Sequence, residues 1–223
     1  MKKNKIFIAC DSTNIQKIRE IIKKSKTSKL KVGYKFGLEF LNSKKGRYFV
    51  SKLKNKIIFG DYKIADIPNT CLSAVKAVKD LNLSYITIHI SSGLQALKAA
   101  KKVAGKTKLI GVSILTSLDK KSLREIGYNS DVKKIVYKQA KLAKKAKLDA
   151  MVCSPQEIKI VKKIFKKEII TPGIRFNLDT NDHKRVMTPR EAIKAGADSL
   201  VIGRPLTNGN IKKNILKLIK LLK

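Results

Sequence analysis

The chain has 223 residues, 43% of them hydrophobic and 30% charged, which is enough apolar material for a packed core and excludes a disordered composition. Lys and Arg number 51 against 16 Asp and Glu, so the formal net charge of +35 points to an anionic partner: nucleic acid, a membrane surface or a phosphorylated substrate. Because the lysines are spread along the whole chain, we expect most of them to lie on a solvated surface.

Eight short apolar runs recur along the chain and predict eight β-strands. They cover residues 5–11, 30–36, 56–63, 85–90, 108–116, 150–154, 168–174 and 199–204. Runs such as 57–59 and 200–202 are apolar at every position, which is typical of parallel strands buried on both faces. The Lys-rich segments between the strands carry apolar residues at helical spacing, for example Cys71, Val75 and Val78.

Strands that alternate with helices predict a parallel sheet, and eight such units in 223 residues predict a (β/α)8 TIM barrel. The basic, amphipathic stretch 211–223 has the pattern of a membrane-surface helix, but the eighth helix of the barrel explains it with fewer assumptions. No linker or low-complexity tract interrupts the sequence, so we expect one catalytic domain over residues 1–223. Catalytic groups in such barrels lie at the carboxyl ends of the strands.

Charged side chains gather at the predicted ends of the early strands. Asp61 and Lys63 are two residues apart on one strand, so their side chains face the same way, and Lys35 of the neighbouring strand can approach Asp61. Asp66 follows in the loop over the mouth. The pattern predicts an alternating row of lysines and aspartates in which each ammonium stays charged. Because perturbed titrating groups gather at functional sites, we interpret the row as an active site rather than a salt-bridge plug.

The loops after the last two strands predict a phosphate site, as barrel enzymes often hold a phosphate there. Arg175 and Arg204 offer guanidinium groups that can bind phosphate oxygens in pairs. Gly203 would let the backbone come close to the ligand.

The ten residues from Asp61 to Thr70, DYKIADIPNT, resemble the signature of the orotidine 5'-phosphate decarboxylase family. Further matches follow in chain order at residues 8–11, 87–89, 113–117, 152–155, 171–175, 185–189 and 201–205. The resemblance implies a decarboxylation of orotidine 5'-monophosphate to UMP, the last step of de novo pyrimidine nucleotide synthesis, without cofactor or metal. It also implies a homodimer.

The resemblance implies a role for each member of the charged row. Lys63 would protonate C6 of the pyrimidine as carbon dioxide leaves, and Asp61 would face the departing carboxylate. Lys35 would contact the ribose and hold Asp61, while Asp11 would bind a ribose hydroxyl. Lys31 also matches the family pattern on the second strand, although the spacing to Asp61 favours Lys35.

The remaining implied roles concern the base and the phosphate. Thr116, with Ser117 beside it, would read the pyrimidine edge, and Arg175, Gly203 and Arg204 would hold the 5'-phosphate.

Three more residues follow from the same resemblance. Asp66 and Thr70 would reach the site of the partner subunit, so that an isolated monomer would be inactive. His183 stands where the family usually has Gln, next to phosphate and base, and can still donate a hydrogen bond to phosphate.

Two other functions fit parts of the sequence. Metal-dependent keto-sugar phosphate decarboxylases and synthases of the same superfamily share the D-x-K-x-x-D pattern, but they take a metal-binding carboxylate at the end of the second strand, where this chain has Lys31 and Lys35. A nucleic-acid-binding protein suits the charge, but Trp is absent and no stacking motif is present, so we expect no specific nucleic-acid partner.

Three cysteines, Cys10, Cys71 and Cys153, make neither a disulfide framework nor a paired metal motif, so a reducing compartment is favoured. The N-terminal apolar run is only five residues long, and no run reaches the ~20 residues of a membrane span. We therefore expect a cytoplasmic protein without a membrane partner.

Overall fold

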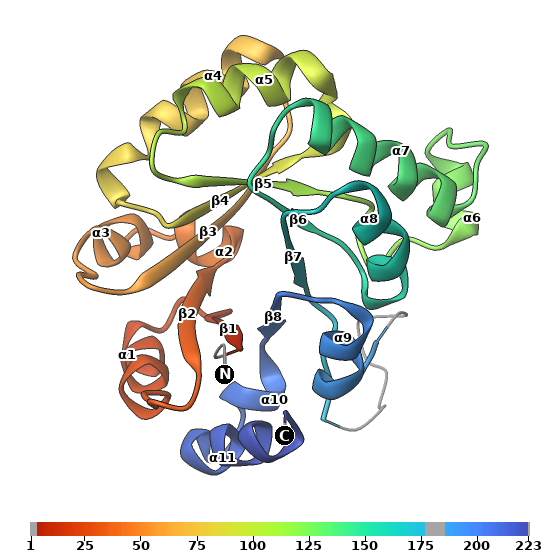
Figure 1. Cartoon of the computed structure of the whole chain (residues 1–223). Coiled ribbons are helices and arrows are strands. Elements are labelled where there is room, and N and C mark those ends of the chain that lie inside the picture. Colours follow the sequence, from red (N-terminus) through yellow and green to blue (C-terminus); the bar gives the residue numbers. More distant parts are fainter. Residues whose placement is uncertain (1–3, 177–185, 223) are drawn as a thin grey trace.

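Eight parallel strands form a closed barrel in the computed structural model, which describes residues 4–176 and 186–222 (Figure 1). Each strand pairs with its neighbours in chain order, and β8 closes the barrel against β1. The predicted (β/α)8 barrel is therefore confirmed. The strands are β1 (Lys5–Ala9), β2 (Lys31–Phe36), β3 (Ile57–Ile64), β4 (Tyr85–His89), β5 (Lys108–Val112), β6 (Ala150–Val152), β7 (Glu168–Thr171) and β8 (Ser199–Ile202).

Helices surround the barrel as an outer ring (Figure 1). They are α1 (Ile15–Lys24), α2 (Leu38–Leu41), α3 (Gly46–Ser51), α4 (Pro68–Ala77), α5 (Gly93–Val103), α6 (Lys120–Glu125), α7 (Val132–Lys145), α8 (Ile158–Ile164), α9 (Pro189–Ala195), α10 (Arg204–Thr207) and α11 (Ile211–Leu221), with short 3-10 turns η1 (Lys79–Leu81), η2 (Ile90–Ser92) and η3 (Pro155–Glu157). Helix α11 is the eighth barrel helix that the sequence predicted. Among the described residues, no helix combines the length and apolarity that crossing a bilayer requires.

Two apolar layers explain why the strand sequences are nearly continuous hydrophobic runs. One layer fills the barrel, where the rings of Phe7 and Phe59 and those of Phe7 and Tyr85 pack edge-on at 5.1 Å. The other, larger layer lies between the outer face of the strands and the helices. Each strand therefore buries both of its faces, as parallel strands in a barrel must.

Several strands end earlier at the mouth than their apolar runs predict. Strand β6 has only three residues, because Pro155 soon begins a 3-10 turn. Its neighbours β5 and β7 then have no β6 ladder partner beyond Val112 and Ile170. Thr116 and Arg175 consequently lie in loops rather than at strand ends.

Strand β3 has an irregular register with β4 directly at the mouth. Gly60 pairs with Ile86, but the next pair along the ladder is Ile64 with Ile88. Three residues of β3 therefore face one residue of β4. Such bulges bend a strand and redirect its side chains.

A half-buried carboxylate, that of Glu168, lies at the opposite, N-terminal end of the barrel. Glu168 accepts hydrogen bonds from Lys5 at 2.7 Å, Ser199 at 2.8 Å, Tyr85 at 3.0 Å and Lys108 at 3.2 Å. Burial would raise the pKa of Glu168, but the hydrogen bonds from Lys5 and Ser199 and the two lysine charges hold it below its ordinary value. One carboxylate thus joins residues of five strands.

We expect Glu168→Ala to lower the free energy of unfolding by about 3 kcal/mol at pH 7, because it leaves the half-buried Lys5 without its counter-ion. Urea denaturation measures the difference. A lowered pKa means that this stability is present at neutral pH and is lost as the pH falls below about 4. Glu20→Ala, which removes an exposed helical pair with Lys24, should change little. Equal losses in the two variants would contradict the prediction.

Candidate active site

A cavity of about 280 Å³ opens at the carboxyl ends of the strands. Its floor is apolar and includes Phe59, Val112, Ile114, Val152 and Val201, while charged side chains stand on two sides. Concave sites of this kind, with few polar groups above an apolar floor, typically bind small molecules. The predicted site residues that line the cavity are Asp11, Lys35, Asp61, Lys63, Thr116, Arg175, Gly203 and Arg204.

One side of the cavity carries a continuous row of opposite charges. The Lys35 Nζ atom lies 3.2 Å from Asp11 Oδ1 and 3.6 Å from Asp61 Oδ2, and the Lys63 Nζ atom lies 2.7 Å from the same Asp61 oxygen. The order along the row is Asp11, Lys35, Asp61, Lys63. The prediction that Asp66 is the fourth member within one chain is wrong, because Asp66 lies exposed outside the cavity and Asp11 takes the other end.

The two inner members of the row, Lys35 and Asp61, are largely shielded from solvent. Desolvation would lower the pKa of Lys35, but Asp61 and Asp11 raise it above its ordinary value. Desolvation would raise the pKa of Asp61, but Lys35, Lys63 and a hydrogen bond from Thr87 hold it below its ordinary value. Both groups are therefore charged at neutral pH. The two lysines and two aspartates of the row have a net charge of zero.

The second strand places its two lysines at opposite ends of the barrel. Lys31 begins β2 beside Lys5, whereas Lys35 pairs with Ala9 near the mouth. Both residues have the same strand parity, so the direction of their side chains could not separate them in the sequence. The four residues between them correspond to about 13 Å along the strand.

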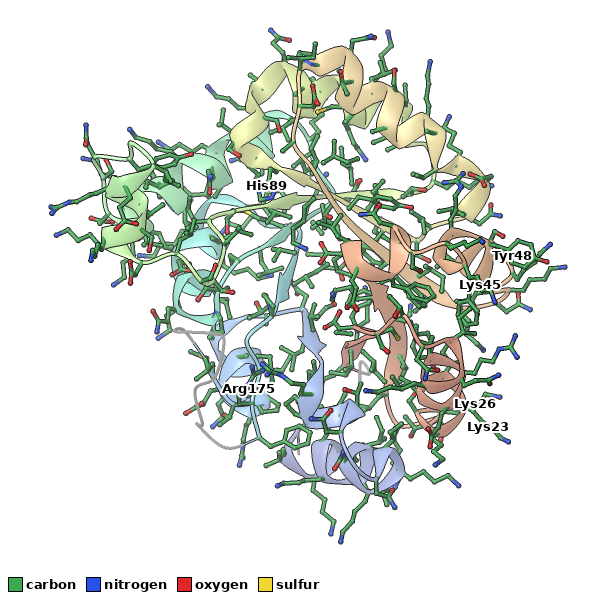
Figure 2. The ribbon with its side chains drawn as sticks, turned by 180° about the vertical axis from the view of Figure 1, so that it is seen from behind. Lys23, Lys26, Lys45, Tyr48, His89 and Arg175 are labelled. Atoms are coloured by element: carbon green, nitrogen blue, oxygen red, sulfur yellow. The ribbon has the colours of Figure 1, made fainter. Side chains whose placement is uncertain are left out.

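The other side of the cavity carries the predicted phosphate groups. Arg175 is half-buried, and its Nη1 donates to the Ile174 carbonyl oxygen at 3.1 Å (Figure 2). Arg204 is exposed and begins α10. A Cβ atom on Gly203 would lie 3.5 Å from the Ala9 side chain and 3.7 Å from Asp11 Oδ2, so glycine leaves that space free for a ligand. Cations from two neighbouring loops thus share one cavity.

Three predicted residues in the described part of the chain do not line this cavity. Asp66 and Thr70 are exposed, in the loop after β3 and in the first turn of α4. Ser117 is exposed beside Thr116, which does line the cavity. His183 lies outside the described residues.

Two further residues near the charged row had no role in the sequence analysis. Thr87 on β4 is fully buried and contacts both Asp61 and Lys63. His89 ends the same strand (Figure 2), and burial, followed by the Lys63 charge, lowers its pKa below the ordinary value. Thr87 lies within a segment that resembles the family, but a lone threonine in an apolar strand gives no signal of function.

The part of the chain that the structure describes contains no group of three His, Cys, Asp or Glu side chains that could hold a metal ion. The two carboxylates at the mouth, Asp11 and Asp61, are instead bound to lysine ammonium groups.

A closed parallel barrel with a charged cavity at its carboxyl-terminal mouth defines a TIM-barrel protein with a small-molecule site. A family model described as the orotidine 5'-phosphate decarboxylase / HUMPS family matches residues 4–218, and the chain belongs to this family.

Known relatives cover nearly the whole chain. The orotidine 5'-phosphate decarboxylase of Wolbachia sp. subsp. Brugia malayi is 43% identical over 223 residues, 97% of each chain. The enzyme of the same name from Coxiella burnetii (strain RSA 331 / Henzerling II) is 41% identical, over 91% of this chain and 89% of its own. The crystal structure of orotidine 5'-phosphate decarboxylase from Lactobacillus acidophilus is 30% identical with a TM-score of 0.85, covering 99% of this chain and 100% of its own. These names do not favour the metal-dependent keto-sugar alternative.

We expect Asp61→Asn to lower the free energy of unfolding by about 2 kcal/mol at pH 7, because Lys35 and Lys63 would face each other across a neutral amide. The lowered pKa of Asp61 means that the difference from the wild type is full at neutral pH and shrinks as the pH falls below about 4. Urea denaturation at several pH values tests this. Asp66→Asn, at an exposed position, is the matched control, and an equal effect there would contradict the assignment.

Proposed function

We propose that this protein is an orotidine 5'-phosphate decarboxylase, which converts orotidine 5'-monophosphate to UMP and carbon dioxide without a cofactor. The observation that carries the proposal is the buried Asp61 carboxylate held between Lys35 and Lys63, in the same cavity as Arg175 and Arg204. The family to which the chain belongs and the names of its relatives support the same reaction.

The reaction requires a cation beside the reacting carbon. The bond between C6 and the carboxylate breaks, carbon dioxide leaves, and the electron pair stays on C6, where no π-system accepts it. Lys63 stabilises this charge and then transfers a proton from Nζ to C6. Its hydrogen bond to Asp61, at 2.7 Å, holds the ammonium in place before the substrate arrives.

The neighbouring residues orient both the lysine and the ribose. Asp61 faces the departing carboxylate and remains ionised, because Lys35 and Lys63 keep its pKa low. Lys35 contacts the ribose and holds Asp61, and Asp11 binds a ribose hydroxyl. The distances within the row support this division, since Lys35 reaches both carboxylates.

The other end of the substrate supplies binding energy. Arg175, Arg204 and the backbone at Gly203 bind the 5'-phosphate. Thr116, with Ser117 next to it, reads the pyrimidine edge. Contacts to a phosphate remote from C6 can lower the barrier at the reacting carbon if they help to close the site around it.

The site is completed by a second subunit. Asp66 and Thr70 are exposed beside the mouth, and Ile67 between them has 67% of its surface exposed. An exposed large apolar residue next to two polar ones suits a subunit interface. Asp66 and Thr70 of each chain therefore reach the active site of its partner in a homodimer. The proposal includes a cytoplasmic location, where the three buried cysteines stay reduced.

Carbon dioxide release from orotidine 5'-monophosphate, measured with EDTA present, tests the reaction. We expect fast release by the wild type and a loss of roughly 10³-fold or more in Lys63→Ala, because one preorganised cation is removed. Lys31→Ala, at the opposite end of the barrel, should retain activity. Release that needs added magnesium, or substantial activity in a folded Lys63→Ala protein, would contradict the proposal.

Mixed dimers test the shared site. Lys63→Ala and Asp66→Asn should each be nearly inactive alone, because every site then lacks one group. In a dimer with one subunit of each kind, one of the two sites is intact. Random mixing of the two variants should therefore restore about a quarter of the wild-type activity. Activity that stays at the level of the separate variants would mean that Asp66 does not serve the partner's site.

A further inference from the structure

The bulge in β3 leaves one residue of β4 in an unusual position. Between the pairs Gly60–Ile86 and Ile64–Ile88, the only β4 residue is Thr87. It faces the segment that carries Asp61 and Lys63, whose backbone has left the regular ladder. Backbone N–H and C=O groups of β3 that lose their ladder hydrogen bonds through the irregular register must find partners other than the β4 backbone.

The Thr87 side chain supplies such a partner. Its Oγ1 atom accepts a hydrogen bond from the backbone N–H of Lys63 at 2.8 Å. The same hydroxyl donates to Asp61 Oδ1 at 3.0 Å. Thr87 is fully buried, so water does not compete for either bond. One hydroxyl therefore connects the backbone of one site residue to the carboxylate of another.

The backbone of Lys63 needs this support. Its φ angle is +48°, in the left-handed region that residues with a Cβ atom rarely adopt. Such a conformation persists only where surrounding contacts hold it, and it is concentrated at functional sites. The hydrogen bond from its N–H to Thr87 is one such contact.

The second bond orients the carboxylate. With Oδ1 bound to Thr87, the other oxygen, Oδ2, is the one that meets Lys63 at 2.7 Å and Lys35 at 3.6 Å. The hydroxyl thus determines which oxygen faces the lysines, and it does so from a neighbouring strand.

We propose that Thr87 is a positioning residue. Before the substrate binds, its hydroxyl already aligns the Lys63 backbone and the Asp61 carboxylate for the later proton transfer. This inference rests on the roles of Asp61 and Lys63 given under the proposed function. Thr87 does not line the cavity, so it acts through those two residues and not by touching the substrate.

Three variants separate the hydroxyl from the shape of the side chain. Thr87→Val keeps the shape and removes both hydrogen bonds, and we expect kcat to fall about 10- to 100-fold while KM changes less than about threefold. Thr87→Ser keeps the hydroxyl and should stay within about threefold of the wild-type kcat. Thr171→Val is the matched control, since Thr171 is a buried strand threonine whose hydroxyl has no partner among the described residues.

The pH dependence of kcat/KM distinguishes a lost hydrogen bond from a loss of packing, because a loss of packing alone would not shift its acidic limb. Asp61 is faced by Lys35 from β2, Lys63 from its own strand and Thr87 from β4, with Asp11 beyond Lys35 and His89 at the end of β4. Because the Thr87 hydrogen bond favours the ionised carboxylate, its loss should move the acidic limb of kcat/KM to higher pH in Thr87→Val. Thr87→Ser should keep the wild-type limb.

Lys63→Ala provides the reference for these outcomes. If Lys63→Ala is inactive but Thr87→Val keeps its kcat and its acidic limb, the inference about Thr87 is overturned while the proposed function stands. If Lys63→Ala keeps its activity, the proposed roles fail first. If a urea titration shows no unfolding transition for Thr87→Val, the variant is not folded and Thr87→Cys replaces it. A thiol is a weak hydrogen-bonding group of similar size. A wild-type kcat in folded Thr87→Cys would then equally overturn the inference.

Discussion

The mouth of this barrel depends on one carboxylate between two ammonium groups. Asp61 is buried, and it is the one described carboxylate that forms ion pairs with both Lys35 and Lys63. The closed sheet makes this arrangement possible, because it places the ends of β2 and β3 side by side. Asp11 then offsets the second lysine charge, and two arginines lie across the same cavity.

Much of the fold could be predicted from the sequence, because both faces of every strand are buried and each strand therefore appears as an apolar run. Where the strands end could not be predicted. The apolar run of β5 continues past Val112, but its ladder ends there because β6 provides no further partner. The bulge in β3 could not be predicted either, because the register depends on how two strands pair and not on the sequence of one segment.

Part of the site was predictable from strand alternation, even though Asp61 and Lys63 lie in the irregular part of β3. Asp61, Lys63 and Lys35 were placed together by side-chain parity and by neighbouring strands, and the structure brings them together. Asp66 could not be placed in this way, because it follows the end of the strand, where parity no longer applies. Thr87 was missed for another reason, since a threonine inside an apolar strand has the same pattern whether it fills space or holds a backbone.

The two polar clusters of the barrel lie at opposite ends, with the apolar layer of Phe7, Phe59 and Tyr85 between them. Glu168 ties the strands together at one end, and the charged row occupies the other. Substitutions at such a distance, without shared partners, usually have additive effects on stability. Sequence drift or laboratory evolution can therefore alter the chemistry at the mouth while the closure of the barrel is conserved, which makes the scaffold tolerant of new specificities.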